Sequence, residues 1–220
     1  MPRKLFDREL VDLISQMTDM GNTVDERIEG TITALRTMDL AKAAEIANSD
    51  NEIDQTEHNI EKLCMNLIAM QQPIASDLRV IASCLKILTD IEREADQCAD
   101  ICEILTAAEL NTNSLAVAHA VQMLEASRDM FRSAMDVFLS HDVEAARDVC
   151  RRDDYVDGMF SKIILEVCGI ITENPQNVMR EVDLLFISKY IERMGDHATN
   201  IAEWVIYMET GVHPDLNTKE

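Results

Sequence analysis

The sequence predicts an all-α protein built as two tandem three-helix bundles related by internal duplication. Hydrophobic residues make up 47% of the 220 residues, aromatics only 4%, and there are just 6 glycines and 4 prolines. This composition favours helices over sheets. Apolar residues recur at helical spacing along most of the chain, and the second half repeats the pattern of the first. We therefore expect residues 1–110 to form one bundle and residues 111–220 the other.

Three helices account for the first half. Apolar residues from Leu10 to Leu35 lie at i, i+3 and i+4 spacing and predict the first helix. Asp39 is a suitable N-cap for a second helix, which should run to the break at Gln71-Gln72-Pro73. A third helix is predicted from about Ala75 to Ala108.

The second half repeats this plan after a polar connector at residues 109–113. A helix is predicted from Leu115 to Leu139, and Asp142 caps the next helix as Asp39 does in the first half. Asn174-Pro175 should end that helix, because a residue before proline tends to leave the α region. The last helix is predicted from about Val178 to Thr210, with Gly211 as its C-terminal stop.

Charge and cysteine content restrict the partners and the compartment. The net charge is −21 and both halves are acidic, so a nucleic-acid backbone or an anionic membrane surface would be repelled. No apolar run approaches the length of a membrane span, and the N-terminus lacks the apolar core of a signal peptide. The six cysteines form no CxxC pattern, and we expect buried structural thiols in a reducing cytoplasm.

Pairs of acidic residues recur between the two halves at i,i+4 spacing, which places both carboxylates on one side of a helix. Asp50 and Asp54 recur 103 positions later, and Glu92 and Asp96 recur 100 positions later. Since such like charges repel one another, they indicate a cation among them. The predicted metal ligands are Asp50, Asp54, Glu92 and Asp96 in one cluster, and Asp153, Asp157, Glu192 and Asp196 in the other, with Asp100 and Asn200 as peripheral oxygen ligands.

Hairpin geometry predicts that each set of four carboxylates meets. Position 52, between the first pair, lies 21 residues before Pro73, and position 94, between the second pair, lies 21 residues after it. Around Asn174 the corresponding separations are 19 and 20 residues. Because antiparallel helices have equal rise per residue, the two pairs should lie at the same level. Oxygen ligands of this kind suit Mg, Mn, Ca or iron.

Other readings of these residues remain open. Single i,i+4 acid pairs also arise by chance in so acidic a chain, and Arg93 or Arg193 could neutralise a neighbouring carboxylate without metal. The alternatives are a metal-free helical scaffold and a carboxylate-bridged metal enzyme, either an oxidase or a phosphohydrolase. No histidine has glutamate three positions before it, which argues against a di-iron oxidase. His197 is expected to be solvated on a surface helix.

Two segments resemble the PhoU family. They are QQPIASDLRVIASCLKILTDIEREADQCADI, from Gln71 to Ile101, and SKYIERMGDHATNIAEWV, from Ser188 to Val205. The resemblance covers nearly the whole chain, and the family motif of an acidic residue, three spacers and aspartate maps onto the same four pairs. In the first copy Ala95 stands where the family commonly has glycine.

The resemblance implies a cytoplasmic negative regulator of phosphate uptake and phosphate-starvation signalling, not an enzyme. It implies two multinuclear metal clusters, with iron or zinc as the expected metal. It further implies partnership with the ATPase subunit of a phosphate ABC transporter and with a sensor histidine kinase. The long amphipathic helices are compatible with a homodimer.

Overall fold

A computed structural model describes residues 2–49, 51–71, 73–108, 110 and 114–214. The described residues form seven α-helices and one short 3₁₀ helix, and they include no strand. The elements are α1 (Pro2–Thr37), α2 (Leu40–Ala47), α3 (Asn51–Gln71), α4 (Ala75–Ala107), α5 (Leu115–Ser140), α6 (Val143–Glu173), η1 (Pro175–Asn177) and α7 (Val178–Thr210). The all-α prediction is confirmed.

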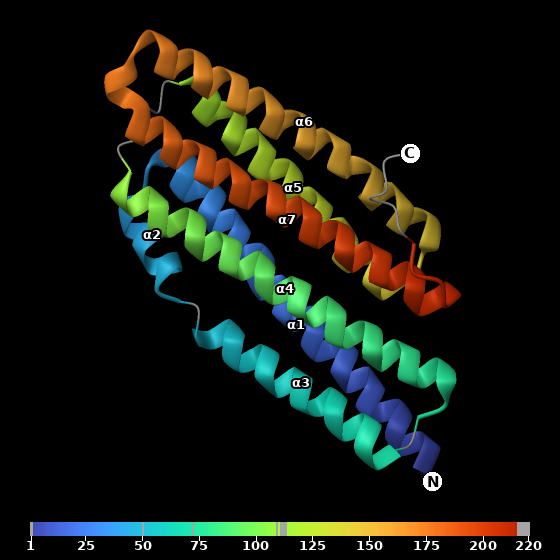
Figure 1. The fold of residues 1–220 in the computed structure, drawn as a ribbon. Coiled ribbons are helices and arrows are strands. Elements are labelled where there is room, and N and C mark those ends of the chain that lie inside the picture. The colour runs from blue at the N-terminus through green and yellow to red at the C-terminus, as the bar shows by residue number, and fades with distance from the viewer. Residues whose placement is uncertain (1, 50, 72, 109, 111–113, 215–220) are drawn as a thin grey trace.

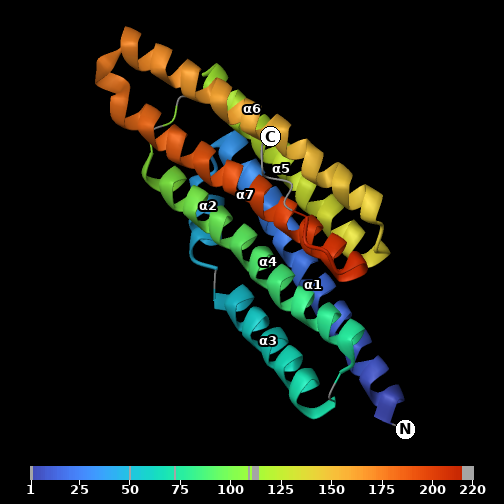
Figure 2. The same ribbon diagram turned by 45° about the vertical axis from the view of Figure 1, so that its right-hand side comes forward.

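Two groups of packed helices lie side by side (Figure 1). The first group contains α1 to α4, and the second contains α5 to α7. Both views show α4 and α7 next to each other in the middle, with α3 at one outer edge and α6 at the other (Figure 2). The helices α1 and α5 also contact each other across the two groups. We call the first group the first bundle and the second group the second bundle.

The expected helix from Asp39 to Gln71 is wrong in one respect, because it is divided into α2 and α3. Polar side chains end α2: Asn48 Nδ2 donates to the Ala44 carbonyl (2.6 Å) and Ser49 Oγ donates to the Ile46 carbonyl (2.9 Å). Arg27 Nη2 then holds the Ser49 carbonyl at 2.6 Å. Such side-chain bonds compete with continuation of a helix. Asp50 lies outside the described residues.

The predicted caps agree with the structure. The Asp39 carboxylate accepts from the Lys42 backbone N–H, and the Asp142 carboxylate accepts from those of Glu144 and Ala145. Gly211 ends α7 with φ +75°, a conformation that glycine adopts without a Cβ clash.

An apolar core runs through both bundles and includes the fully buried Phe131 and Phe138. Four cysteines are buried as expected, but Cys150 is only partly buried and Cys168 is exposed. Cys168 lies on α6, and the prediction of a buried thiol there is wrong. Along the described part of the chain, no helix combines the length and apolar character that a bilayer crossing requires.

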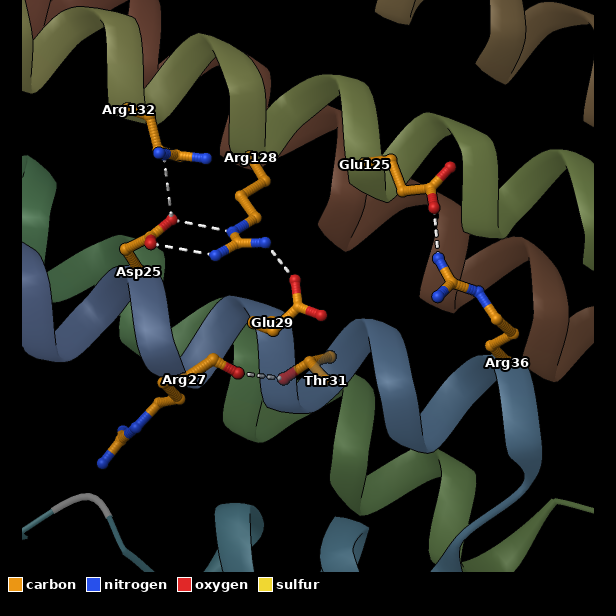
Figure 3. Close-up of polar contacts among 8 residues, drawn as sticks. All are labelled: Asp25, Arg27, Glu29, Thr31, Arg36, Glu125, Arg128 and Arg132. Carbon is orange, nitrogen blue, oxygen red and sulfur yellow. Dashed lines mark hydrogen bonds and ion pairs between the residues drawn. The ribbon is translucent and has the colours of Figure 1, made fainter.

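Ion pairs join α1 to α5 (Figure 3). Arg128 donates from Nε and Nη2 to the two carboxylate oxygens of Asp25 at 2.7 and 2.9 Å, and from Nη1 to Glu29. Arg36, two turns after Glu29 on α1, pairs with Glu125 of α5. On the other side of the interface, Arg79 Nε of α4 donates to the Met208 carbonyl at 2.9 Å, near the end of α7. These contacts fix the antiparallel arrangement of the two bundles.

Candidate metal centres

The second predicted cluster lies between α6 and α7. The pKa of Asp153 is raised to about 7, first by burial and then by the charges of Asp196, Asp157, Glu192 and Asp154. The pKa of Asp196 is also raised by burial and by Glu192, while Lys189 opposes this effect. These electrostatic interactions show that the four predicted carboxylates share one neighbourhood, as the hairpin geometry requires.

Asp153 is the innermost group of this second cluster. Its Oδ1 atom is buried and has no hydrogen-bond partner among the described residues. Gly195 of α7 makes room for it, since a Cβ at position 195 would lie 3.0 Å from Asp153 Oδ1 and 3.2 Å from Val156 Cγ1. A buried carboxylate oxygen without a donor is energetically costly. The chemistry of this atom therefore fits a cation as its partner.

The first cluster lies between α3 and α4 and is partly described. The pKa of Glu92 is raised to about 7, first by burial and then by the charge of Asp96. The charge of Arg93 opposes this rise, while Glu57 and Asp54 add to it. Asp54, Glu92 and Asp96 are thus close in space as predicted. Asp50, the fourth predicted ligand, lies outside the described residues.

Basic side chains already contact several of these carboxylates. Arg93 Nη1 lies 2.7 Å from Asp96 Oδ2, and its Nε lies 3.4 Å from Glu92 Oε2. In the second cluster Lys189 pairs with Glu192. Within the described ranges, no three or more histidine, cysteine, aspartate or glutamate side chains are arranged so that they could hold one metal ion. The structure shows neighbouring carboxylates rather than a converged coordination sphere, and their metal role stays a prediction.

The residues of the second cluster nevertheless fit a hard cation. Its four central predicted ligands are carboxylates, which suit iron, Zn, Mg, Mn or Ca. The unpartnered Asp153 oxygen and the space left by Gly195 add a structural reason. Side-chain rotation, including release of Glu192 from Lys189, would be needed for these carboxylates to converge on one ion.

The two predicted peripheral ligands, Asp100 and Asn200, lie in different surroundings. Asn200 Nδ2 donates to Asp90 Oδ1 of α4 at 3.2 Å, so Asn200 contacts the neighbouring bundle. Asp100 is partly buried on α4, one turn after Asp96.

A polar contact between the bundles is not predicted by the sequence. His197 Nδ1 lies 2.9 Å from Asp90 Oδ1, and the histidine is partly buried rather than solvated. Glu94 lies nearby on α4 and is fully buried, and its carboxylate oxygens have no hydrogen-bond partner among the described residues. Burial, followed by Asp90, raises the pKa of Glu94 well above its usual value. The differences between copies, Asp90 for Tyr190 and Glu94 for Met194, were the available signal.

Glu57 is a further neighbour of the first cluster that is not among the predicted ligands. Burial raises its pKa, followed by the charges of Glu61 and Asp54. Its position three residues after Asp54 on one helix face could have indicated this contact. The second copy has Phe160 at this position, so the two clusters differ in composition.

The helical fold, with its paired carboxylates in two similar bundles, defines a class of duplicated all-α proteins, and comparisons identify the family. The sequence matches the PhoU domain over residues 17–105 and again over residues 120–205. The chain belongs to the PhoU family.

Curated relatives match over nearly the whole length. A phosphate-specific transport system accessory protein PhoU homolog of Clostridium acetobutylicum is 35% identical over 218 residues, covering 99% of this chain and 100% of the relative. A homolog of the same name from Rhizobium meliloti is 33% identical, covering 95% of this chain and 89% of the relative.

Solved structures share the fold. The crystal structure of PhoU from Pseudomonas aeruginosa matches with a TM-score of 0.89 at 30% identity, covering 94% of this chain and 100% of that one. The phosphate transport system regulatory protein PhoU from Streptococcus pneumoniae matches with a TM-score of 0.88 at 30% identity, covering 96% of this chain and 99% of that one.

Proposed function

We propose that this chain is an accessory protein of a phosphate-specific transport system, and that it represses phosphate uptake and phosphate-starvation signalling. The match to relatives of that name over nearly their full length carries the proposal. The proposed partners are the ATPase subunit of a phosphate ABC transporter and, where the cell has one, a sensor histidine kinase. The chain would act in the cytoplasm as an adaptor, without catalysing a reaction, and as a homodimer.

The proposed role of the acidic clusters is to couple cation binding to the rigidity of two helix pairs. A bound divalent or trivalent cation, with iron or zinc preferred, would supply positive charge, and the carboxylate oxygens would coordinate it. Asp153 and Asp157 would then be held against Glu192 and Asp196, which ties α6 to α7. Asp54 would similarly be held against Glu92 and Asp96, which ties α3 to α4. Stiffened helix pairs would present a fixed acidic face to a partner.

Arg93 favours a second reading for the first cluster. Its guanidinium contacts both Glu92 and Asp96 and supplies the charge that a cation would otherwise provide. In this reading the first bundle is a metal-free scaffold and only the second bundle holds metal. Separate metal analysis of Asp54→Asn and Asp157→Asn tests this reading, since only Asp157→Asn would lower the metal content.

A strain lacking the gene tests the proposed function directly. Expression from a phosphate-starvation promoter, measured in phosphate-rich medium, should be high in the deletion strain and should be repressed again by the plasmid-borne chain. Pull-downs with the purified ATPase subunit and kinase should recover the chain. Unchanged promoter activity in the deletion strain, together with no recovery by either partner, would refute the proposal.

A further inference from the structure

The two bundles differ at the start of their first helix. Helix α1 has 36 residues and α5 has 26. Met38 and His141 are equivalent, since each has positive φ and each precedes a capping aspartate. In this alignment Leu115, the first residue of α5, is equivalent to Asp12 of α1. The first three turns of α1 therefore have no counterpart in α5.

Those three turns cover the α3–α4 hairpin of the first bundle. The N-terminal end of α1 lies beside the α3–α4 turn, and Phe6 within it is only 4% exposed (Figures 1 and 2). In both views the α6–α7 turn instead projects beyond the start of α5. Among the described residues, no segment of the second bundle thus takes the place that the start of α1 has in the first.

A groove occupies this place in the second bundle. It is a cavity of about 460 Å³ bounded by the start of α5, the end of α6 and the start of α7. Leu165 and Leu115 line it and are 74% and 72% exposed. Exposed apolar side chains beside a cavity indicate a binding surface.

The groove also contains acidic residues, whereas two of the corresponding positions in the first bundle are apolar. Glu166 and Glu181 stand where the first copy has Leu63, which packs against the apolar core, and Ile81, which belongs to that core. The lining includes three carboxylates and one guanidinium, so its net charge is negative. Glu181 is buried and pairs with Arg180 at 3.2 Å, and Glu166 pairs with His119 at 2.8 Å. Glu173 is the exposed carboxylate of the lining. Since charge complementarity selects partners, an occupant should carry cationic as well as apolar side chains.

We propose that this groove docks a short amphipathic helix of a partner protein, which presents a bulky apolar side chain together with lysine or arginine. Residues 2–11 (PRKLFDRELV), with three basic and two acidic residues, show the kind of helix that fits such a position in the first bundle. The proposal rests on the adaptor role proposed above and names its docking surface. It does not depend on metal binding.

Fluorescence anisotropy with a labelled peptide of residues 2–11 tests the groove in the full-length protein. Gly169 lies in the groove, and a Cβ built there meets nothing within 4 Å, so Gly169→Trp should fold and block the site. Gly158 on the same helix is equally open but lies outside the lining, which makes Gly158→Trp the matched control. We expect Gly169→Trp to weaken peptide binding at least about tenfold and Gly158→Trp to change it less than about twofold.

Peptide variants test the chemistry of the occupant. Replacing Phe6 by Ala, or Arg3, Lys4 and Arg8 by Glu, should each weaken binding about tenfold or more. No saturation up to about 1 mM peptide would overturn the proposal, as would equal binding by Gly169→Trp and wild type.

Sedimentation distinguishes a partner protein from a second copy of this chain. Conversion of a dimer to a monomer by Gly169→Trp alone would show that a second copy fills the groove, and would overturn the partner assignment. The promoter assay separates the two proposals: if wild type restores repression while the peptide fails to bind, the groove is refuted and the adaptor function stands.

Discussion

Asp153 combines three features that determine the electrostatics of the second cluster. It is partly buried, three other predicted ligands raise its pKa, and its Oδ1 atom has no hydrogen-bond donor in the part of the chain that the structure describes. Its pKa of about 7 lies above its ordinary value of 3.8. The metal-free protein should therefore be destabilised by this carboxylate at neutral and higher pH.

The variant Asp153→Asn tests how much this carboxylate destabilises the metal-free protein. Between about pH 4 and 7 the folded chain retains a proton at Asp153 that the unfolded chain has released, so wild-type stability falls as pH rises through this window. At pH 8 the variant should be more stable by about 1 kcal/mol, after allowance for solvent screening, and near pH 4 the two should be alike. Urea unfolding in the presence of a chelator measures the difference. A variant less stable than wild type at pH 8 would contradict the assignment.

The sequence could predict which carboxylates lie together but not every neighbour. Repetition and register identified Asp153, Asp157, Glu192 and Asp196 because both depend only on spacing along two helices. Arg93 was recognised as a competing cation, whereas the pairing of Lys189 with Glu192 depends on side-chain rotamers. Asp90 and His197 meet only because two bundles dock, which spacing within one hairpin does not specify.

Helix boundaries followed the caps where one strong signal dominated. Asp39, Asp142 and Gly211 were each predicted at the ends they occupy. The break between α2 and α3 was not predicted, because Asn48 and Ser49 are compatible with a helix until their side chains bond back to its carbonyls. In the second copy the equivalent residues are Arg151 and Arg152, and α6 continues without a break.

Helix α6 should depend on its N-cap. Asp142 accepts two backbone N–H groups at 3.0 Å, which would lose their partner in Asp142→Ala. We expect a loss of about 1 kcal/mol in the free energy of unfolding, while Asp142→Asn should retain most of the stability because asparagine also caps well. Denaturant titration of the two variants gives the comparison. Equal stability of Asp142→Ala and wild type would show that the cap contributes little.

At the scale of the whole molecule, the two bundles are joined by apolar packing and by charged contacts at both interfaces. Arg128 of α5 holds Asp25 and Glu29 of α1, and its side chain is only 20% exposed. Arg132 approaches the same Asp25 at 3.9 Å but is 59% exposed (Figure 3). The duplicated sequence could predict the architecture of each bundle, but these contacts join the equivalent helices α1 and α5 through residues that the duplication does not retain, since Arg128 stands where the first copy has Asp25.

Arg128→Met should therefore weaken the association of the bundles more than Arg132→Met. Removing Arg128 leaves the partly buried Asp25 and the exposed Glu29 without their main cation, which should cost about 2 kcal/mol. Removing the more exposed Arg132 should cost less than about 0.5 kcal/mol. Thermal unfolding at low and high salt measures both. A similar loss for the two variants would show that Arg128 does not join the bundles in the way proposed.

Metal content of the purified full-length chain tests the central claim most directly. Mass-spectrometric elemental analysis, after gel filtration, should find at least one iron or zinc ion per chain. It should also find a clear loss in the double variant Asp153→Asn/Asp196→Asn, while Asp148→Asn, an exposed acid on the same helix, should keep the wild-type content. Wild type with far less than one ion per chain, or a double variant with unchanged metal, would contradict the account.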